Sequence, residues 1–520
     1  MLATDLVPTN GATKSERIAS YAPATGQLLG TAPVMSADEV HAAMLRAKRA
    51  QVSWGALSIE ERCERVLRYR DAIIDREEEL TDLLSSETGK PRQEALMQEI
   101  ATTASVATYF CKVAPKLLAP RETPLLLLKH KKSMIHYTPR GVVAVISPWN
   151  YPFFLPLRDA LIALIAGNSV VIKPSEVTPL IALRAKEVWD RAGLPPDVLQ
   201  VVTGYGPAGA ALIDAHPAFV VFTGGTSTGR RVAAACGERL IPCVMELGGK
   251  APLIACEDAD VDKAARAAVF GGFSNSGQIC ISVERVYANE KIHDALLDRM
   301  IERVGALRQG DPAAGSVDVG AIIFPKQIEI AEAHIRDAVS KGARVVAGGK
   351  RKEGPGQFFE PTILAGCDHT MTVMNEEIFG PIVPVMKVSS DEEALRLANA
   401  SHLGLNAYVF SKDRDHAYGV AQRVEAGSVC VNDVLINGGC PEAPFGGVKQ
   451  SGFGRMMGDE SLREMCDVRH ILLDRAVLDQ TAPAAPIDFP YTDKGLSIAR
   501  KVVRVVLGGG SLWKRLSSVL

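Results

Sequence analysis

The 520-residue sequence predicts an α/β protein built on a doubly wound parallel sheet. From Gly141 to about residue 247, short apolar runs typical of buried strands alternate with helical stretches of about 8–15 residues. A polar or glycine-rich segment follows each run, and in a parallel sheet such segments gather beyond the carboxyl ends of the strands, where ligands bind. A second α/β segment begins at about Gly248.

The remaining elements follow from periodicity and turn residues. Residues 18–34 predict two short strands around a turn at 24–26, and residues 125–139 predict a hairpin of two strands. Residues 36–86 and 92–112 predict helices, because apolar residues recur there at three- and four-residue spacing. In the alternating region, strands are expected at 142–147, 169–173, 198–202, 218–223 and 240–247, and helices at 155–166, 179–192, 207–214 and 226–237.

Composition and charge restrict the class of protein. Hydrophobic residues make up 47% and charged residues 23% of the chain, and the net charge of −2 gives no reason to expect a nucleic-acid partner. The ten cysteines form no CxxC pair, which predicts neither a metal site nor a disulfide framework. The N-terminal residues lack the pattern of a signal peptide, and no apolar run reaches 18 residues. We therefore expect a cytoplasmic enzyme with reduced cysteines.

The strongest candidate for a nucleophile is Cys280, in the run GGFSNSGQICI. A thiol attacks carbonyls as a thiolate, and so needs a base or a positive field nearby. No histidine is close in sequence, whereas Glu246 lies 34 residues upstream in MELGGK, at a predicted strand end, and is the local candidate for the base. For either residue alone, a buried structural cysteine or a solvated glutamate is the alternative.

Other strand ends carry candidates for substrate and cofactor binding. Asn150 in SPWN has an amide that could donate to an oxyanion, or could belong to an ordinary turn. Lys173 and Glu176 in KPSE could bind ribose hydroxyls, or be solvated charges. The glycine-rich FTGGTSTGR precedes a helix and could bind phosphate. Glu377 in NEEIFGP could position a nicotinamide ribose or cap a helix.

In this order, SPWN, KPSE, FTGGTSTG, MELGGK, GQIC, EEIFGP and PFGGVKQSG resemble the aldehyde dehydrogenase superfamily over roughly residues 18–475. The resemblance implies a Rossmann-type dinucleotide-binding domain, an α/β catalytic domain and a small β element for oligomerisation. The implied ranges are 1–121 with 140–247 for the first, 248–455 for the second, and 122–139 with 456–480 for the third; residues 481–520 remain as a basic C-terminal tail.

The resemblance also implies NAD(P)⁺-dependent oxidation of an aldehyde to a carboxylic acid. Cys280 would form a thiohemiacetal and then a thioester, with the oxyanion held by Asn150 and the Cys280 backbone N–H, and Glu246 would activate the hydrolytic water. NAD is the expected cofactor, since Glu176 would repel a 2′-phosphate, and NADP is possible. A homodimer or homotetramer is expected. The implied cofactor contacts are Pro148, Trp149, Lys173, Ser175, Glu176, Gly206, Phe222, Gly224, Gly225, Ser227, Leu247, Glu377 and Phe379.

Two features predict different substrates. Arg158 matches a carboxylate-binding position of the succinate-semialdehyde dehydrogenases, which this chain resembles there; the alternative is an exposed helix arginine paired with Asp159. The tail KGLSIARKVVRVVLGGGSLWKRL mixes basic and apolar residues and could lie on a membrane surface, which suits a medium- or long-chain aliphatic or an aromatic aldehyde. A cofactor-independent thiol esterase and a non-catalytic binding protein are remote alternatives.

Overall fold

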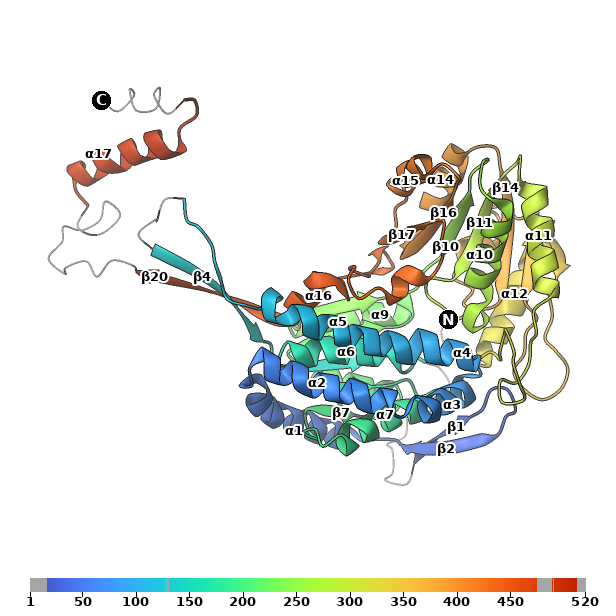
Figure 1. Cartoon of the computed structure of the whole chain (residues 1–520), viewed down its shortest axis with the longest axis horizontal. Helices are drawn as coiled ribbons and strands as arrows, with labels where there is room; N and C mark the ends of the chain where they lie inside the picture. The colour runs from blue at the N-terminus through green and yellow to red at the C-terminus, as the bar shows by residue number, and fades with distance from the viewer. Residues whose placement is uncertain (1–15, 127, 129–130, 475–488, 490, 512–520) are drawn as a thin grey trace. The chain divides into compact units, whose positions relative to one another are not determined.

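The computed structural model describes residues 16–126, 128, 131–474, 489 and 491–511 (Figure 1). The chain divides into two compact units. The larger combines the chain up to Leu117 with Pro139–Asp467, and the smaller combines Leu118–Thr138 with the chain from Val468 onward. Among the described residues, no helix is both long enough and apolar enough to span a membrane.

The N-terminal part of the larger unit is mainly helical. After the antiparallel pair β1 (Arg17–Tyr21) and β2 (Leu28–Pro33), three helices follow: α1 (Ala37–Gly55), α2 (Ile59–Ile74) and α3 (Glu77–Thr88). Both α1 and α2 begin at capping boxes, Ser36 with Glu39 and Ser58 with Glu61. The helix predicted at 92–112 consists of α4 (Arg92–Glu94), the π-helical η1 (Ala95–Ala101) and α5 (Thr102–Leu117).

A six-stranded sheet confirms the predicted doubly wound fold. Its order is β19-β9-β8-β5-β6-β7, and all neighbours are parallel except the edge strand β19. The strands are β5 (Val142–Ile146), β6 (Ser169–Lys173), β7 (Leu199–Val201), β8 (Phe219–Thr223), β9 (Cys243–Glu246) and β19 (Gly452–Phe453). The connecting helices are α6 (Phe154–Ile165), α7 (Pro179–Arg191), α8 (Gly206–Asp214) and α9 (Thr226–Glu238). The order reverses between β5 and β8, which is where such sheets bind ligands.

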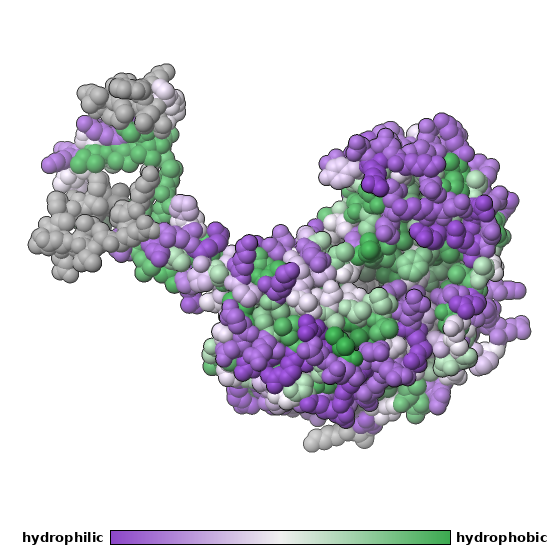
Figure 2. Space-filling model, in the orientation of Figure 1, coloured by the Kyte–Doolittle hydropathy of each residue, from purple (hydrophilic) through white to green (hydrophobic). Residues whose placement is uncertain are grey.

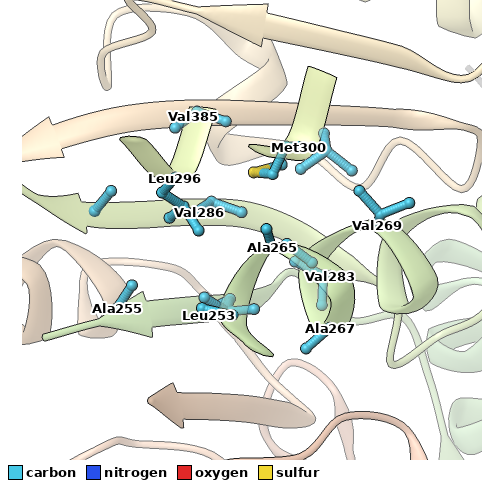
Figure 3. Packing of buried hydrophobic residues seen from close by; sticks show 14 of the residues in the cluster. Leu253, Ala255, Ala265, Ala267, Val269, Val283, Val286, Leu296, Met300 and Val385 are labelled. Atoms are coloured by element: carbon cyan, nitrogen blue, oxygen red, sulfur yellow. The ribbon is translucent and has the colours of Figure 1, made fainter. Parts of the chain in front are cut away.

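A second sheet of seven strands holds the residues after Gly248, in the order β12-β13-β14-β11-β10-β16-β17, with only β12 antiparallel to its neighbour. Its strands are β10 (Ala251–Ala255), β11 (Val283–Asn289), β12 (Arg344–Ala347), β13 (Thr362–Ala365), β14 (Ile382–Val388), β16 (Asn406–Phe410) and β17 (Ser428–Val431). Helices α10 (Val261–Phe273), α11 (His293–Gly305), α12 (Lys326–Ser340), α14 (Asp391–Asn399) and α15 (Arg414–Ala421) pack with them. Figure 3 shows Leu253, Val286 and Val385 of three neighbouring strands in one apolar cluster with Leu296 and Met300 of α11.

The smaller elements of the larger unit complete its description. They are the 3-10 turns η2 (Ser274–Gly277) and η3 (Ile436–Gly439), the short helices α13 (Thr372–Asn375) and α16 (Gly458–Glu464), and the two-stranded pair β15 (Leu403–Gly404) and β18 (Val448–Lys449). The segment expected to close the catalytic domain, 443–455, contributes β19 to the six-stranded sheet, next to Glu246. Residues 458–464 form α16, which packs against α5 and α6 in the larger unit.

The hairpin predicted at 125–139 is wrong in its first strand. In the smaller unit, β4 (Lys131–Pro139) pairs with β3 (Arg121–Glu122), so the partner strand lies before residue 125. Pro124 ends β3 because proline has no N–H to donate to the ladder. The third strand of this sheet is β20 (Cys466–Asp474), and the order is β20-β4-β3.

The C-terminal part of the smaller unit contains α17 (Asp493–Val502) and the π-helical η4 (Val503–Leu507). Their apolar residues are exposed: Leu496, Ile498, Val502, Val503, Val506 and Leu507. Figure 2 shows these residues as a green band. Lys494, Arg500, Lys501 and Arg504 interleave with them, as predicted, whereas Trp513, Lys514 and Arg515 of the predicted amphipathic stretch lie outside the described residues.

Candidate active site

The candidate residues from strand ends gather at one edge of the six-stranded sheet, as the sequence predicts. Parallel neighbours bring the segments together: the Ser147 N–H donates to the Lys173 carbonyl (3.1 Å), and the Gly224 N–H donates to the Glu246 carbonyl (3.0 Å). The loops after β5, β6, β8 and β9 therefore lie side by side, although up to about 100 residues separate them in sequence.

Cys280 lies between η2 and the start of β11, at the amino end of the second sheet. The turn before it places Asn275 and Ser276 in left-handed conformations, with φ of 47° and 55°. The Cys280 carbonyl oxygen packs directly on Gly249, where an added Cβ would collide with it. The MELGGK and GQIC motifs are therefore in contact, and glycine at 249 is what permits their approach.

The Cys280 thiol is half-buried and protonated at neutral pH. Burial is the main cause, and the neighbouring carboxylates of Glu377 and Glu246 add to it; together they raise the thiol pKa to about 12, while Arg158 acts in the opposite direction. The charges of these three side chains therefore act on the Cys280 thiol.

Glu246 ends β9 with its side chain 3% exposed. Neither carboxylate oxygen has a hydrogen-bond partner among the described residues. Burial raises the Glu246 pKa to about 8, partly opposed by Arg158 and Arg455. An unsatisfied buried carboxyl is costly for stability, so a requirement other than stability is expected to keep it there. Its pKa suits a general base near neutral pH.

Asn150 is held by a buried ion pair that the sequence analysis missed. The Lys90 ammonium donates to the Asn150 carbonyl (2.8 Å) and to Glu99 Oε1 (2.5 Å), and both charged side chains are fully buried. Glu99 Oε2 accepts from the backbone N–H groups of Phe153 (2.8 Å) and Phe154 (3.1 Å), and so caps α6. The pair fixes the loop that presents Asn150.

The Asn150 side chain itself points toward the cysteine loop. Its Nδ2 donates one hydrogen to the Gln278 carbonyl (2.9 Å), two residues before Cys280, which leaves the second N–H for another acceptor. Glu94 also stabilises the loop before Cys280, because its carboxylate accepts from Ser274 Oγ (2.7 Å) and the Asn275 N–H (2.9 Å). The short helices around Arg92–Ala101 thus supply carboxylates to both the asparagine and the cysteine loops.

A second missed pair positions the NEEIFGP segment. Lys250 and Glu284 form a buried ion pair of 2.9 Å, and the Glu284 carboxylate accepts from the backbone N–H groups of Ile378 and Phe379. Glu377 accepts from the Gly249 N–H (2.9 Å), and burial and the charge of Glu284 raise its pKa to about 8. Phe379, with a φ of 53°, places its ring 5.3 Å from that of Trp149 in an edge-to-face contact.

Several of the predicted dinucleotide-binding segments have donors or acceptors that can form further hydrogen bonds. The buried Lys173 ammonium donates to the Pro174 carbonyl (2.8 Å) and lies 3.7 Å from Glu176, whose side chain is 42% exposed. Gly225 is the N-cap of α9 without a side-chain cap, so the first-turn N–H groups are open to an anion. Buried Ser147 Oγ and Thr223 Oγ1 have no hydrogen-bond partner among the described residues. These groups fit the hydroxyls and phosphates of a dinucleotide.

The other predicted cofactor residues fall in two places. Near the carboxyl edge of the six-stranded sheet lie Pro148, Trp149, Ser175, Gly206, Phe222, Gly224, Ser227 and Leu247, and in the segment before β14 lie Glu377 and Phe379. Phe222 and Leu247 are buried within a small cluster with Met245, and Gly206 is exposed at the start of α8. These residues thus differ in how accessible they are to a ligand.

Arg158 is buried rather than exposed, 1% accessible within α6, a helix whose residues are all buried. Its Nε donates to Asp159 Oδ1 (2.7 Å), as the structural alternative expects, but its Nη2 has no partner among the described residues. Its charge acts on both Glu246 and Cys280. An unsatisfied guanidinium N–H near the nucleophile is free to bind an anionic group.

Known proteins are similar to this chain over most of its length. The model of the aldehyde dehydrogenase family matches residues 10–471. The chain belongs to the aldehyde dehydrogenase family. Among similar proteins, a 4,4′-diapolycopene aldehyde oxidase of Methylomonas sp is 38% identical over 504 residues, covering 96% of this chain and 93% of the relative. A putative NADP⁺ succinate-semialdehyde dehydrogenase of Mycobacterium ulcerans is 40% identical over 453 residues, covering 87% of each chain.

Solved aldehyde dehydrogenases share the fold as well. The NAD⁺ complex of an aldehyde dehydrogenase from Bacillus cereus has a TM-score of 0.85 at 33% identity, covering 88% of this chain and 93% of that one. An NADP-dependent enzyme of E. coli has a TM-score of 0.86 at 34% identity, covering 89% and 96%. The aldehyde dehydrogenase described here is accordingly an oxidoreductase with the predicted fold class.

Proposed function

We propose that this aldehyde dehydrogenase oxidises an aldehyde to a carboxylic acid with NAD(P)⁺, using Cys280 as nucleophile and Glu246 as the base for hydrolysis. The observation that carries the proposal is the contact between the MELGGK and GQIC motifs. It brings the segment of the half-buried Cys280 thiol against the segment of Glu246, whose buried carboxyl has no hydrogen-bond partner among the described residues. NAD(P)⁺, when bound, supplies the hydride acceptor.

Cys280 Sγ, after losing its proton, attacks the aldehyde carbon and forms a thiohemiacetal. The free N–H of the Asn150 amide and the Cys280 backbone N–H donate to the oxygen that becomes negative. Loss of hydride leaves a thioester on Cys280. Glu246 then takes a proton from a water as it attacks the thioester carbon; the carboxylic acid leaves and Cys280 Sγ regains a proton.

The pKa values of the Cys280 thiol and the Glu246 carboxyl favour a role for Glu246 in hydrolysis rather than in activation of the thiol. Proton transfer from a thiol with a pKa of about 12 to a carboxylate with a pKa of about 8 is unfavourable by about 5 kcal/mol. Glu246 is therefore a poor base for the thiol. It is better suited to a later step, in which its proton acceptor role is coupled to attack by water.

For the cofactor, we propose the predicted residues at the sheet edge and in the 377–379 segment. Lys173 and Glu176 would bind the ribose near the adenine, and the amino end of α9 the phosphates. The half-exposed Glu176 favours NAD, because a 2′-phosphate beside its carboxylate would be repelled. The larger unit would then comprise the proposed dinucleotide-binding and catalytic domains.

For the substrate, we propose a lipophilic aldehyde. The exposed apolar residues of α17 and its interleaved basic residues suit a helix at a membrane surface carrying anionic lipids. The match to the 4,4′-diapolycopene aldehyde oxidase leaves too few residues unmatched to exclude α17, so the likeness extends into this helix. Such a helix would bring the enzyme to a membrane that contains its substrate.

Succinate semialdehyde is the second candidate, supported by one observation. The Nη2 of buried Arg158, which has no hydrogen-bond partner within the described part of the chain, is an available donor for a substrate carboxylate. Several similar mycobacterial proteins are named putative succinate-semialdehyde dehydrogenases. The lipophilic proposal gives Arg158 a different role, as the positive charge that lowers the pKa of the Glu246 carboxyl and of the Cys280 thiol.

The deciding experiment is steady-state NADH and NADPH formation across a graded panel: succinate semialdehyde, benzaldehyde and aliphatic aldehydes from about two to sixteen carbons. A kcat/KM maximum at the long chains supports the lipophilic proposal, and a maximum at the semialdehyde overturns it. Cofactor-independent hydrolysis of an ester, without NADH or NADPH formation from any aldehyde, would indicate an esterase, and lack of any turnover a binding protein.

We also propose that the smaller unit mediates homo-oligomerisation, as a dimer or tetramer. Its strand β20 exposes Val468, Ile471, Leu472 and Leu473, each at least 37% accessible in the single chain. A run of exposed apolar residues on a short sheet is typical of a surface that a second copy covers. Light scattering of the purified protein tests this: a monomer would contradict it.

A further inference from the structure

The larger unit holds a cluster of potential metal ligands that the catalytic proposal does not use. Cys256, Asp391 and His416 each offer one ligand atom, and these three atoms lie within 4.8 Å of one another. His416 Nε2 lies 2.7 Å from Asp391 Oδ2. The residues are far apart in sequence, so no CxxC or similar spacing could reveal them.

Each ligand comes from a different element at one edge of the seven-stranded sheet. Cys256 directly follows β10, Asp391 is the first residue of α14, and His416 is in the first turn of α15. Three independent elements thus deliver a thiol, a carboxylate and an imidazole to one point. Cys256 is 1% exposed, Asp391 half-buried and His416 exposed, so the cluster can be reached from solvent.

The cluster is separate from the candidate active site. Strands β10 and β11 run parallel, with Ala251 beside Val283 and Ala255 beside Ala288. Cys280 precedes the amino end of β11, whereas Cys256 follows the carboxyl end of β10. The two thiols therefore lie at opposite edges of the sheet, about 15 Å or more apart for strands of this length. Figure 3 shows Ala255, the last residue of β10, which directly precedes Cys256.

We propose that Cys256, Asp391 and His416 bind a Zn²⁺ ion, with water completing the coordination. Thiolate sulfur, imidazole nitrogen and carboxylate oxygen are the ligand types that zinc takes, at about 2.0–2.3 Å. Ligand atoms around a tetrahedral ion are then roughly 3.3–3.8 Å apart, so the observed cluster needs only small side-chain rotations. The Cys256 S–H gives up its proton to solvent on binding, and His416 binds as the neutral imidazole.

The charge around the cluster favours a cation. The carboxylates of Asp258 and Asp413 also act on His416, and Asp258 fixes the loop after β16 by accepting from Ser411 Oγ (2.9 Å) and the Asp413 N–H (3.0 Å). The amino ends of α14 and α15 oppose a cation with about half a positive charge each. The carboxylates of Asp258, Asp391 and Asp413 outweigh this, so a divalent ion is attracted on balance.

The test is cobalt and zinc binding to the full-length protein, stripped of metal with a chelator. Co²⁺ is used as a spectroscopic probe, since thiolate coordination gives a near-ultraviolet charge-transfer band. We expect one equivalent of Zn²⁺ to displace Co²⁺ and bleach this band. We also expect Cys256→Ser to lose the band and His416→Gln to weaken Zn²⁺ binding at least about tenfold.

Two matched control variants test whether thiols other than Cys256 give the charge-transfer band. Cys430→Ser removes a buried thiol of the same sheet outside the cluster, and Cys280→Ser removes the proposed nucleophile; both should keep the band. Because His416 is exposed, His416→Gln should fold even if Cys256→Ser does not. A band that survives Cys256→Ser or disappears in Cys280→Ser, or unchanged zinc affinity in His416→Gln, would overturn the proposal.

Discussion

Replacement of Glu246 by glutamine separates the catalytic and the stability effects of a buried carboxyl. Glu246 is 3% exposed, its two oxygens have no hydrogen-bond partner among the described residues, and its pKa is raised from 4.5 to about 8. Glutamine has nearly the shape of the protonated carboxyl but cannot ionise or act as a base. The change therefore removes the ability of residue 246 to ionise and leaves the packing in place.

The expected effect on stability follows from proton linkage. A carboxyl whose folded pKa is raised favours the folded state fully below pH 4.5, and this contribution is lost as the pH rises toward 8. At pH 7 the loss amounts to about 3 kcal/mol, since each pH unit above 4.5 costs about 1.4 kcal/mol. Glu246→Gln should thus be nearly neutral at pH 4.5 and stabilising by about 3 kcal/mol at pH 7.

Thermal unfolding of both proteins from pH 5 to pH 8 measures this effect. The Tm of Glu246→Gln should exceed that of the unaltered enzyme by an amount that grows with pH and reaches a few degrees near neutrality. A Tm difference that stays constant across this range would refute a neutral, buried Glu246. Glu246→Asp, which keeps the ionisable group, is the control for the loss of charge.

The kinetic consequence is measured on the same variant. With a pKa of about 8, roughly a tenth of Glu246 is ionised at pH 7, so hydrolysis of the thioester should accelerate about tenfold between pH 7 and pH 9. In Glu246→Gln, a pre-steady-state burst of NADH should remain while steady-state turnover falls by about 10²–10⁴ and loses this pH dependence. Loss of the burst together with turnover would instead assign Glu246 to activation of the thiol.

Four further changes test other parts of the site. Cys280→Ala should abolish turnover while cofactor binding, followed by fluorescence, persists; appreciable residual activity would mean another nucleophile. Lys90→Met should destabilise the enzyme by about 3–5 kcal/mol in denaturant unfolding because the Glu99 charge stays buried without a partner, and adding Glu99→Gln should recover part of this; equal stability would contradict a buried ion pair. Arg158→Met should raise KM for succinate semialdehyde at least tenfold relative to a long-chain aldehyde if the arginine binds a carboxylate, and equal changes for both would refute that role. Deleting residues 485–520 should reduce sedimentation with anionic liposomes without lowering kcat for a soluble aldehyde; unchanged sedimentation would end the membrane proposal.

The sequence by itself determined the fold class, the family and the positions of the first sheet's parallel strands along the chain. Alternating apolar runs and helices predicted the doubly wound sheet, because the strand and helix periods of a chain are local properties. Strand ends predicted which segments would meet, since parallel strands bring their carboxyl ends to one edge. Glu246 and Asn150 could be selected because each lies at the end of a recognisable strand, and Cys280 because it lies in a glycine-rich run. The structure brings their segments together.

Only the tertiary structure revealed the side chains that hold this arrangement. Lys90 lies between two predicted helices and Glu99 within the second of them, and only packing shows that both are fully buried and fix the Asn150 loop. The burial of Arg158 and the meeting of Cys256 with residues more than 130 positions away were equally hidden. The physical reason is common to all: whether a charged or polar side chain is desolvated depends on contacts made by distant segments, and local sequence patterns do not encode those contacts.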